Sequence, residues 1–156
     1  MGKLLLIIAL GLIFTSTALA GEPGEMDCKG KVDFRTAEVS VESYKNALAA
    51  YQIDIRYDKK KIMIVGLEGG SGGFKNPPFY DRTGLEGGHI IIAAFVDNDS
   101  NAKAGKSKVA LLHLRTTGCA PFKLDATSTA AASPGGTEIP VKAVITFIDN
   151  QSVNNR

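Results

Sequence analysis

Residues 47–58, ALAAYQIDIRYD, decide the fold class of this chain. Four apolar or aromatic residues alternate here with three polar ones: Tyr51, Ile53, Ile55 and Tyr57 with Gln52, Asp54 and Arg56. A period of two residues is typical of a β-strand with one buried side and one side facing water. The charged residues 58–60 that follow predict a turn at the end of this strand.

Short apolar segments separated by turn residues continue on both sides of this stretch. They occupy residues 32–41, 62–67, 89–96, 108–117, 121–128 and 138–148. The resulting seven or eight strands, with no convincing amphipathic helix between them, predict an all-β antiparallel sandwich rather than an α/β fold.

Three local features lead to further expectations. In residues 32–41 the apolar alternation slips between Phe34 and Ala37, which predicts a β-bulge or a strand break. Residues 62–67 and 89–96 are continuous apolar runs, so we expect strands that are covered on both sides. Residues 66–88 contain eight glycines and predict a long loop without regular elements.

The first twenty residues have the pattern of a secretory signal peptide. Lys3 precedes the apolar run 4–14, and Ala18-Leu19-Ala20 forms a small-x-small cleavage site. We therefore expect a mature chain that starts at Gly21, with a retained membrane anchor as the alternative. The remainder divides into a flexible leader (21–31), a domain (32–148) and a polar tail (149–156), and the protein is expected to be extracellular or periplasmic.

The charge balance argues against nucleic-acid binding, and the two cysteines suggest a disulfide. With 18 basic and 16 acidic residues the chain lacks the positive excess that nucleic-acid binding requires. No second hydrophobic stretch approaches membrane length after residue 20. In an oxidising compartment we expect Cys28 and Cys119 to form a disulfide, two unpaired thiols being the alternative.

The sequence predicts neither a cofactor nor a catalytic site. Two histidines and two cysteines at scattered positions have no metal-ligand spacing, and no carboxylate pair stands out for general acid–base chemistry. Residues 97–101 begin like a calcium loop, but Ala102 and Lys108 replace the glycine and glutamate of that motif. We therefore expect loop 97–106 to be a solvated turn.

Residues 47–58, together with 62–65 (IMIV), 66–70 (GLEGG), 88–95 and 105–114, resemble the strands of a cohesin domain. The resemblance covers residues 32–148. It implies a jelly-roll sandwich of about eight or nine strands, a fold that cohesins share with cellulose-binding modules. It also implies a non-catalytic module that binds dockerins or another extracellular protein. Lys59 stands where many cohesins have proline, and Ala50 and Gln52 stand where many dockerin-binding cohesins carry Asn and Asp.

In a cohesin-like arrangement, residues 47–57 and 108–117 are expected to be neighbouring strands of one sheet. Their outward residues would then form one surface with an apolar centre and a charged rim, the usual anatomy of a protein interface. These residues are Gln52, Asp54, Arg56, Leu111, His113 and Arg115.

Two other functions stay open at this point. A carbohydrate-binding module would need exposed aromatic rings to stack on sugars, and the sequence offers Tyr44, Phe79 and Tyr80 for that purpose. The chain could also be a structural subunit of a surface layer. Its partner is accordingly an extracellular or periplasmic protein or a polysaccharide.

Overall fold

The computed structural model describes residues 28–148. The expected signal peptide, most of the leader and the polar tail lie outside these residues. The described chain forms eight strands: β1 (Val32–Glu42), β2 (Ala50–Tyr57), β3 (Ile62–Gly69), β4 (Phe79–Tyr80), β5 (His89–Phe95), β6 (Lys106–Thr117), β7 (Leu124–Ala132) and β8 (Lys142–Ile148). Three short 3-10 helices accompany them: η1 (Gly72–Phe74), η2 (Arg82–Leu85) and η3 (Asp99–Asn101).

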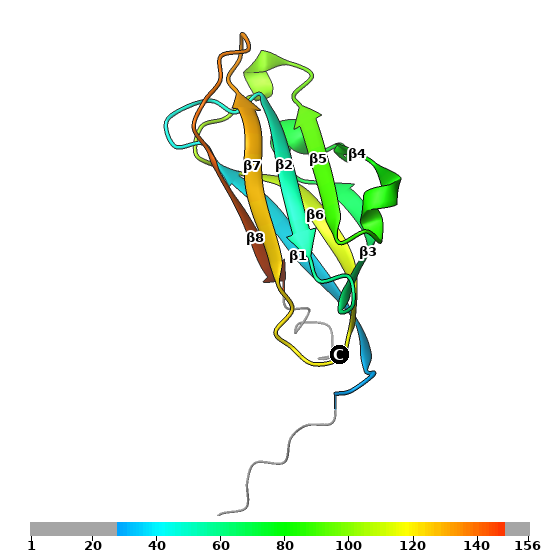
Figure 1. Ribbon diagram of the computed structural model, residues 1–156. Coiled ribbons are helices and arrows are strands. Elements are labelled where there is room, and N and C mark those ends of the chain that lie inside the picture. Colours follow the sequence, from blue (N-terminus) through cyan, green and yellow to red (C-terminus); the bar gives the residue numbers. More distant parts are fainter. Residues whose placement is uncertain (1–27, 149–156) are drawn as a thin grey trace, which may run out of the picture.

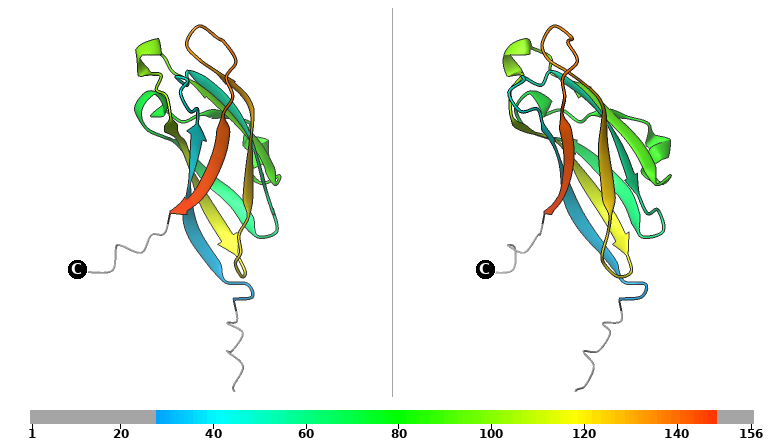
Figure 2. Two further views of the ribbon diagram at one scale, coloured as in Figure 1. Left: turned by 90° about the vertical axis from the view of Figure 1, so that its left-hand side faces the viewer. Right: turned by 60° about the vertical axis from the view of Figure 1, so that its left-hand side comes forward.

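The strands form two four-stranded sheets that pack face to face (Figure 1). The order is β3-β6-β1-β8 in one sheet and β4-β5-β2-β7 in the other, and every ladder is antiparallel. Figure 2 shows this sandwich from its side, with the connecting loops at its two ends. The predicted all-β antiparallel sandwich is confirmed.

The expectation that residues 47–57 and 108–117 are neighbours in one sheet is wrong. Strand β2 lies between β5 and β7, whereas β6 lies between β1 and β3 in the opposite sheet. The period-two pattern of each strand reveals which residues face the core. It does not reveal which strand lies alongside, because the pairing depends on how the connections cross between the two sheets.

The side chains that point inward from both sheets form one hydrophobic core. Ile53 and Ile55 of β2 and Leu112 and Leu114 of β6 are fully buried in it, as the alternation in the sequence predicts. Tyr51 and Tyr57 are also buried, and their hydroxyls find acceptors: Tyr51 donates to the Val109 carbonyl at 3.2 Å. Burying an aromatic hydroxyl without an acceptor would be costly, so these hydrogen bonds permit tyrosine at core positions.

Strands β3 and β5 are half-buried, not covered on both sides. Ile62 and Ile64 of β3 point into the core, but Val65 is exposed. In β5, Ile90 and Ile92 are buried while Ile91 and Phe95 lie on the solvent face. An apolar run therefore predicts a strand here, but it does not predict whether the outer face of that strand is buried.

Strand β1 shows no irregularity between Phe34 and Ala37, contrary to expectation. Its pairing with β6 is continuous through these residues, and the register shift comes later, between Val39 and Ser40. The alternation slips because Val32 and Phe34 point to the outer face of the sheet, where Phe34 is 67% exposed. The slip in the pattern therefore reflects no bulge: the first apolar residues of β1 face solvent, and the later ones face the core.

The glycine-rich segment after β3 is more regular than the sequence predicts. It contains η1, β4 and η2, and it is anchored to the sandwich by Phe74, which is buried 5.3 Å from the ring of Tyr51 in an edge-on contact. The Tyr57 hydroxyl donates to the carbonyls of Gly84 and Leu85 in η2. At Gly70 a side chain would collide with the backbone of Lys108, so glycine allows the segment to pass close to β6.

The predicted disulfide between Cys28 and Cys119 is confirmed. It joins the residues before β1 to the connection between β6 and β7, and the two Cα atoms are 5.1 Å apart. Over the described range 28–148, no helix is long and apolar enough to cross a membrane.

Candidate functional site

The outer face of the sheet β4-β5-β2-β7 presents exposed aromatic, charged and small side chains. We call this surface the candidate face. It is formed by outward residues of four strands: Phe79 of β4; His89, Ile91, Ala93 and Phe95 of β5; Ala50, Gln52, Asp54 and Arg56 of β2; and Asp125, Thr127, Thr129, Ala130 and Ala132 of β7.

A charged cluster lies at the end of the candidate face where β2 ends and β5 begins. Arg56 and His89 are register partners, so both side chains can reach Asp54. His89 Nε2 lies 3.0 Å and Arg56 Nη2 lies 3.3 Å from Asp54 Oδ2. The carboxylate side chain is only 16% exposed, whereas both of its partners extend into solvent.

The pKa of Asp54 reflects this arrangement. Burial alone would raise it, but the hydrogen bonds from His89 and Arg56, together with their charge, lower the pKa of Asp54 below its ordinary value. The carboxylate therefore stays ionised over the physiological range and holds two donors in fixed positions on the sheet.

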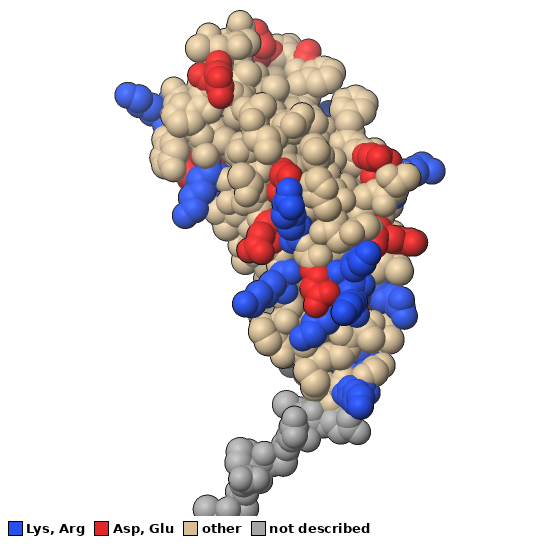
Figure 3. Space-filling model, viewed as in Figure 1, with Lys and Arg blue, Asp and Glu red and all other residues tan. Residues whose placement is uncertain are grey.

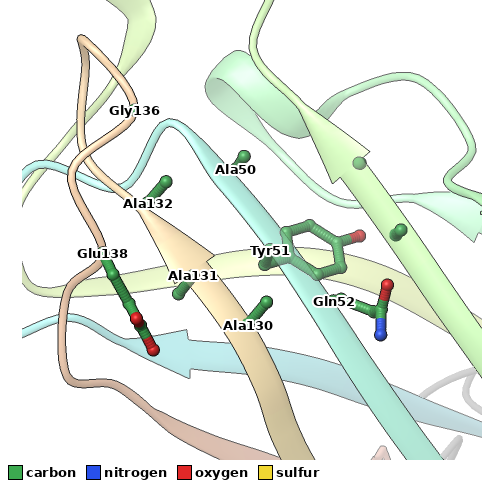
Figure 4. A pocket seen from close by; sticks show the side chains of 10 residues that line it. Ala50, Tyr51, Gln52, Ala130, Ala131, Ala132, Gly136 and Glu138 are labelled. Atoms are coloured by element: carbon green, nitrogen blue, oxygen red, sulfur yellow. The ribbon is translucent and has the colours of Figure 1, made fainter.

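A shallow hollow of about 420 Å³ occupies the other end of the candidate face (Figure 4). Alanines at register positions of three strands form its floor, since Ala50 and Gln52 of β2 pair with Ala132 and Ala130 of β7. Gln52 is held beside the hollow by a 2.9 Å hydrogen bond from its amide to the Thr129 hydroxyl. Small side chains leave room here for an apolar group of a partner.

Two exposed phenylalanines line the β4 edge of the candidate face. Phe79 and Phe95 are 68% and 64% exposed, and their rings stack with centroids 6.1 Å apart. A second hollow of about 140 Å³ lies next to them, lined in part by Asn76, Pro77 and Asp97. From the sequence, Phe79 was expected only as a possible sugar contact. Phe95 was not expected on a surface, because the apolar run 89–96 predicted a strand covered on both sides.

The three other predicted site residues lie on the opposite surface of the molecule. Leu111, His113 and Arg115 point outward from β6 in the sheet β3-β6-β1-β8. His113 Nε2 lies 3.0 Å from Glu68 Oε1 of the neighbouring strand. The structure thus brings Gln52, Asp54 and Arg56 together on one face and Leu111, His113 and Arg115 together on the other, but it does not combine the two sets.

Within residues 28–148, no group of three or more His, Cys, Asp or Glu side chains could hold a metal ion. In the loop that begins like a calcium motif, Asn98 caps η3 by accepting from the Ser100 amide, and the Asn101 side chain donates to Asp97. These polar side chains therefore form hydrogen bonds within the loop.

Comparison with known proteins adds information on the fold. Neither a protein-family model nor a curated protein matches the sequence. Three solved structures are similar to the described sandwich. One chain of the type I cohesin–dockerin complex of Coh-OlpA with Doc918 from Clostridium thermocellum is 15% identical and covers 69% of this chain and 82% of its own, with a TM-score of 0.56.

The second structure is a chain from the complex of a CaDoc0917 variant with CaCohA2. It is 16% identical, with the same coverage and a TM-score of 0.54. A non-cellulosomal cohesin from Archaeoglobus fulgidus is 16% identical over 72% of this chain and 75% of its own, with a TM-score of 0.49. The first two likenesses establish that the chain has the fold of a cohesin domain, which confirms the expected resemblance at the level of fold.

Proposed function

We propose that this chain is a secreted, non-catalytic module that binds another protein through the candidate face. The observation that carries the proposal is the pair of exposed, mutually stacked phenylalanines, Phe79 and Phe95, at the edge of a sheet that also presents charged and small residues. Exposed aromatic side chains of this size are uncommon outside interaction surfaces when they gather at one place.

The layout of the candidate face supports protein binding. Interfaces between proteins combine aromatic anchors and apolar recesses with a polar, partly charged rim. Here the stacked phenylalanines and the alanine-floored hollow supply the apolar part, while Asp54, His89 and Arg56 supply the rim. Of the six residues that the sequence singled out, we propose Gln52, Asp54 and Arg56 for this interface.

The opposite face is the weaker choice for the same partner. Leu111 is partly covered and lies in register between Glu38 and Glu68, which contact Lys108 and His113, so its cross-strand neighbours are charged rather than apolar. Leu111, His113 and Arg115 therefore stay candidates for a different contact, since no partner of ordinary size could touch both sheets at once.

Export from the cytoplasm is supported by the disulfide. Bonds such as Cys28–Cys119 form and persist in oxidising compartments and are rare in the cytosol. This agrees with the signal-peptide pattern of residues 1–20 and suggests an extracellular or periplasmic location.

A dockerin-like protein is the first partner to test. The structure with a TM-score of 0.56 belongs to a cohesin–dockerin complex, and a dockerin-like partner is proposed for this chain by analogy of fold alone. Ala50 and Gln52 alter the polar pattern of β2 relative to many dockerin-binding cohesins, so we expect the partner to differ from their usual dockerins.

The test is affinity capture with matched variants. Immobilised wild-type protein is exposed to the envelope fraction of its own source, and the captured protein is identified and titrated. Phe79→Ser combined with Phe95→Ser should weaken its binding at least tenfold, because truncating central aromatic anchors removes most of the apolar contact. Phe34→Ser, an equally exposed phenylalanine on the opposite sheet, is the matched control and should leave the affinity unchanged.

The same variants distinguish the carbohydrate alternative. A sugar-binding module would be retained on insoluble polysaccharide and would lose retention in the Phe79→Ser, Phe95→Ser variant. Retention on polysaccharide without any protein partner would replace the proposal by that alternative. Equal capture by the wild type and both variants would show that the candidate face is not the interface.

A further inference from the structure

We infer that the end of the sandwich opposite the alanine-floored hollow is a docking surface for an anionic phospholipid membrane. We call this end the lysine tip. It consists of three segments, residues 28–31 (CKGK), 58–61 (DKKK) and 117–123 (TGCAPFK). Six lysines lie in these segments: Lys29, Lys31, Lys59, Lys60, Lys61 and Lys123.

Backbone hydrogen bonds hold the three segments together. The Gly118 amide donates to the Lys31 carbonyl at 2.8 Å, and the Thr117 amide donates to the Lys61 carbonyl at 2.8 Å. The Cys28–Cys119 disulfide adds a covalent connection at the same place. Lysines that are far apart in the sequence are therefore fixed in one region, which a disordered basic tail would not achieve.

The lysine tip has a strong positive charge for a chain that is almost neutral overall. Five of its six lysines are exposed, and Lys61 is partly buried because its ammonium group donates to the Cys119 carbonyl at 3.3 Å. Its one carboxylate, Asp58, accepts a hydrogen bond from the Lys60 amide. Figure 3 shows Lys and Arg side chains gathered toward this end of the molecule, with several Asp and Glu side chains among them and others at the upper end.

Apolar side chains border the lysine tip on the outer face of β1. Val32 directly follows Lys31, and Phe34 pairs in register with Arg115 of β6. Both are exposed although they begin a strand whose later apolar residues are buried. Exposed Val and Phe beside a group of lysines match a lipid interface, where basic residues contact headgroups and apolar side chains enter the acyl boundary.

The arrangement of the lysine tip suits contact with a membrane. The tip is one end of an elongated sandwich, where the loops at residues 28–31, 58–61 and 117–123 meet (Figure 1). A broad, flat array of anionic headgroups can contact several basic loops at once. Docking in this way would leave the alanine-floored hollow and the Phe79–Phe95 pair at the far end, away from the bilayer.

The acidic residues Glu22, Glu25 and Asp27 precede the tip in the sequence, so the test must include them. The full chain is produced by export, purified from the soluble fraction and its N-terminus determined. Binding is measured with vesicles of phosphatidylcholine, with and without phosphatidylglycerol. We expect binding only to the anionic vesicles and a steep loss of binding in high salt, because screening weakens contacts between surface charges.

Charge reversal at the tip provides the decisive variant. Lys59→Glu combined with Lys60→Glu changes two exposed side chains in a turn and should weaken vesicle binding at least about twentyfold, since each lysine near an anionic surface is worth roughly a factor of five. Lys103→Glu combined with Lys106→Glu, exposed positions at the opposite end, is the matched control and should bind like the wild type.

Three results would overturn the inference. One is equal binding to neutral and anionic vesicles, and another is equal loss in the tip and control variants. The third is lysine-dependent binding to a soluble polyanion such as polyglutamate without binding to vesicles, which would assign the tip to polymers instead. Partner capture by the candidate face is measured separately with Phe79→Ser and Phe95→Ser, so the failure of one proposal does not imply the failure of the other.

Discussion

Asp54 shows at the scale of single residues how a sheet can organise its surface. The side chain is mostly covered, yet it remains ionised because two cationic or hydrogen-bonding partners, His89 and Arg56, converge on one carboxylate oxygen. Strand pairing makes this possible, since Arg56 and His89 are register partners and Asp54 lies two residues away on the same face of β2. Asp54 therefore fixes two side chains that the proposed partner would contact.

The lowered pKa of Asp54 predicts a specific pH dependence of stability. A carboxyl whose pKa is lower in the folded than in the unfolded chain contributes stability above the unfolded value, near 3.8, and loses it as the pH falls through the folded value. Asp54→Asn removes this contribution. The melting temperature of the wild type should therefore exceed that of the variant at pH 5, and the difference should shrink steadily below about pH 4.

Thermal unfolding monitored by circular dichroism between pH 5 and pH 2 checks this prediction. Asp99→Asn is the control, because Asp99 is an exposed carboxylate in η3 whose capping role uses its backbone carbonyl. A difference between wild type and Asp54→Asn that does not change over this pH range would show that the ion pairs of Asp54 do not stabilise the folded state.

At the scale of elements, β6 illustrates that the side of the strand on which a residue lies, which we call its parity, decides its burial more than its hydrophobicity does. Leu111 and Leu112 are adjacent and chemically identical, but Leu112 is fully buried between the two sheets while Leu111 is partly exposed on the outer face. Neighbouring residues in a strand point to opposite sides, so one leucine belongs to the core and the other covers the space between Glu38 and Glu68.

Truncating these two leucines should have very different effects on stability. Leu112→Ala should lower the free energy of unfolding by about 3 kcal/mol, because it removes buried apolar contacts and leaves a cavity between the sheets. Leu111→Ala should lower it by less than about 1 kcal/mol, since much of that side chain is still in contact with water. Urea unfolding at equilibrium, with the same slope required for all three proteins, measures both values.

Equal destabilisation by the two variants would mean that Leu111 is covered in solution. A larger effect of Leu111→Ala would mean that the parity of β6 is inverted. In the second case the assignment of His113 and Arg115 to the outer face would be lost as well, because they share the parity of Leu111.

At the scale of the whole molecule, the disulfide closes most of the described chain into one loop. Cys28 and Cys119 are 91 residues apart in sequence, and the bridge ties the start of β1 to the connection after β6. The same place forms the lysine tip, so one covalent bond serves both the stability of the sandwich and the fixed position of its basic segments. The candidate face contains neither cysteine.

Removing the bridge should destabilise the protein strongly without changing its fold. A loop of this length restricts the unfolded chain by about 4 kcal/mol in the chain-entropy estimate. The double variant Cys28→Ser, Cys119→Ser should therefore unfold at a clearly lower urea concentration, while its far-ultraviolet circular dichroism stays that of a β-sandwich. Wild-type protein treated with a reductant should behave like the variant, and an unchanged unfolding midpoint in both would show that the bridge does not stabilise the fold.

The sequence by itself determined the fold class and the inward residues of the strands that alternate clearly. Tyr51, Ile53 and Ile55 could be assigned to the core because the period of a strand is fixed by backbone geometry and needs no knowledge of its neighbours. The same reasoning assigned Leu112 and Leu114. Cys28 and Cys119 could be paired because they are the only two cysteines in the chain.

Only the tertiary structure decided which of these strands lie together. Placing β2 and β6 in different sheets separated Asp54 from His113, although both were predicted to face outward on one surface. It also exposed Phe95 and Phe34, which the sequence pattern alone could not distinguish from core residues. Alternation along a strand reports the two sides of that strand, whereas a surface is created by the strands and loops that the connections bring beside it, and those contacts are long-range in sequence.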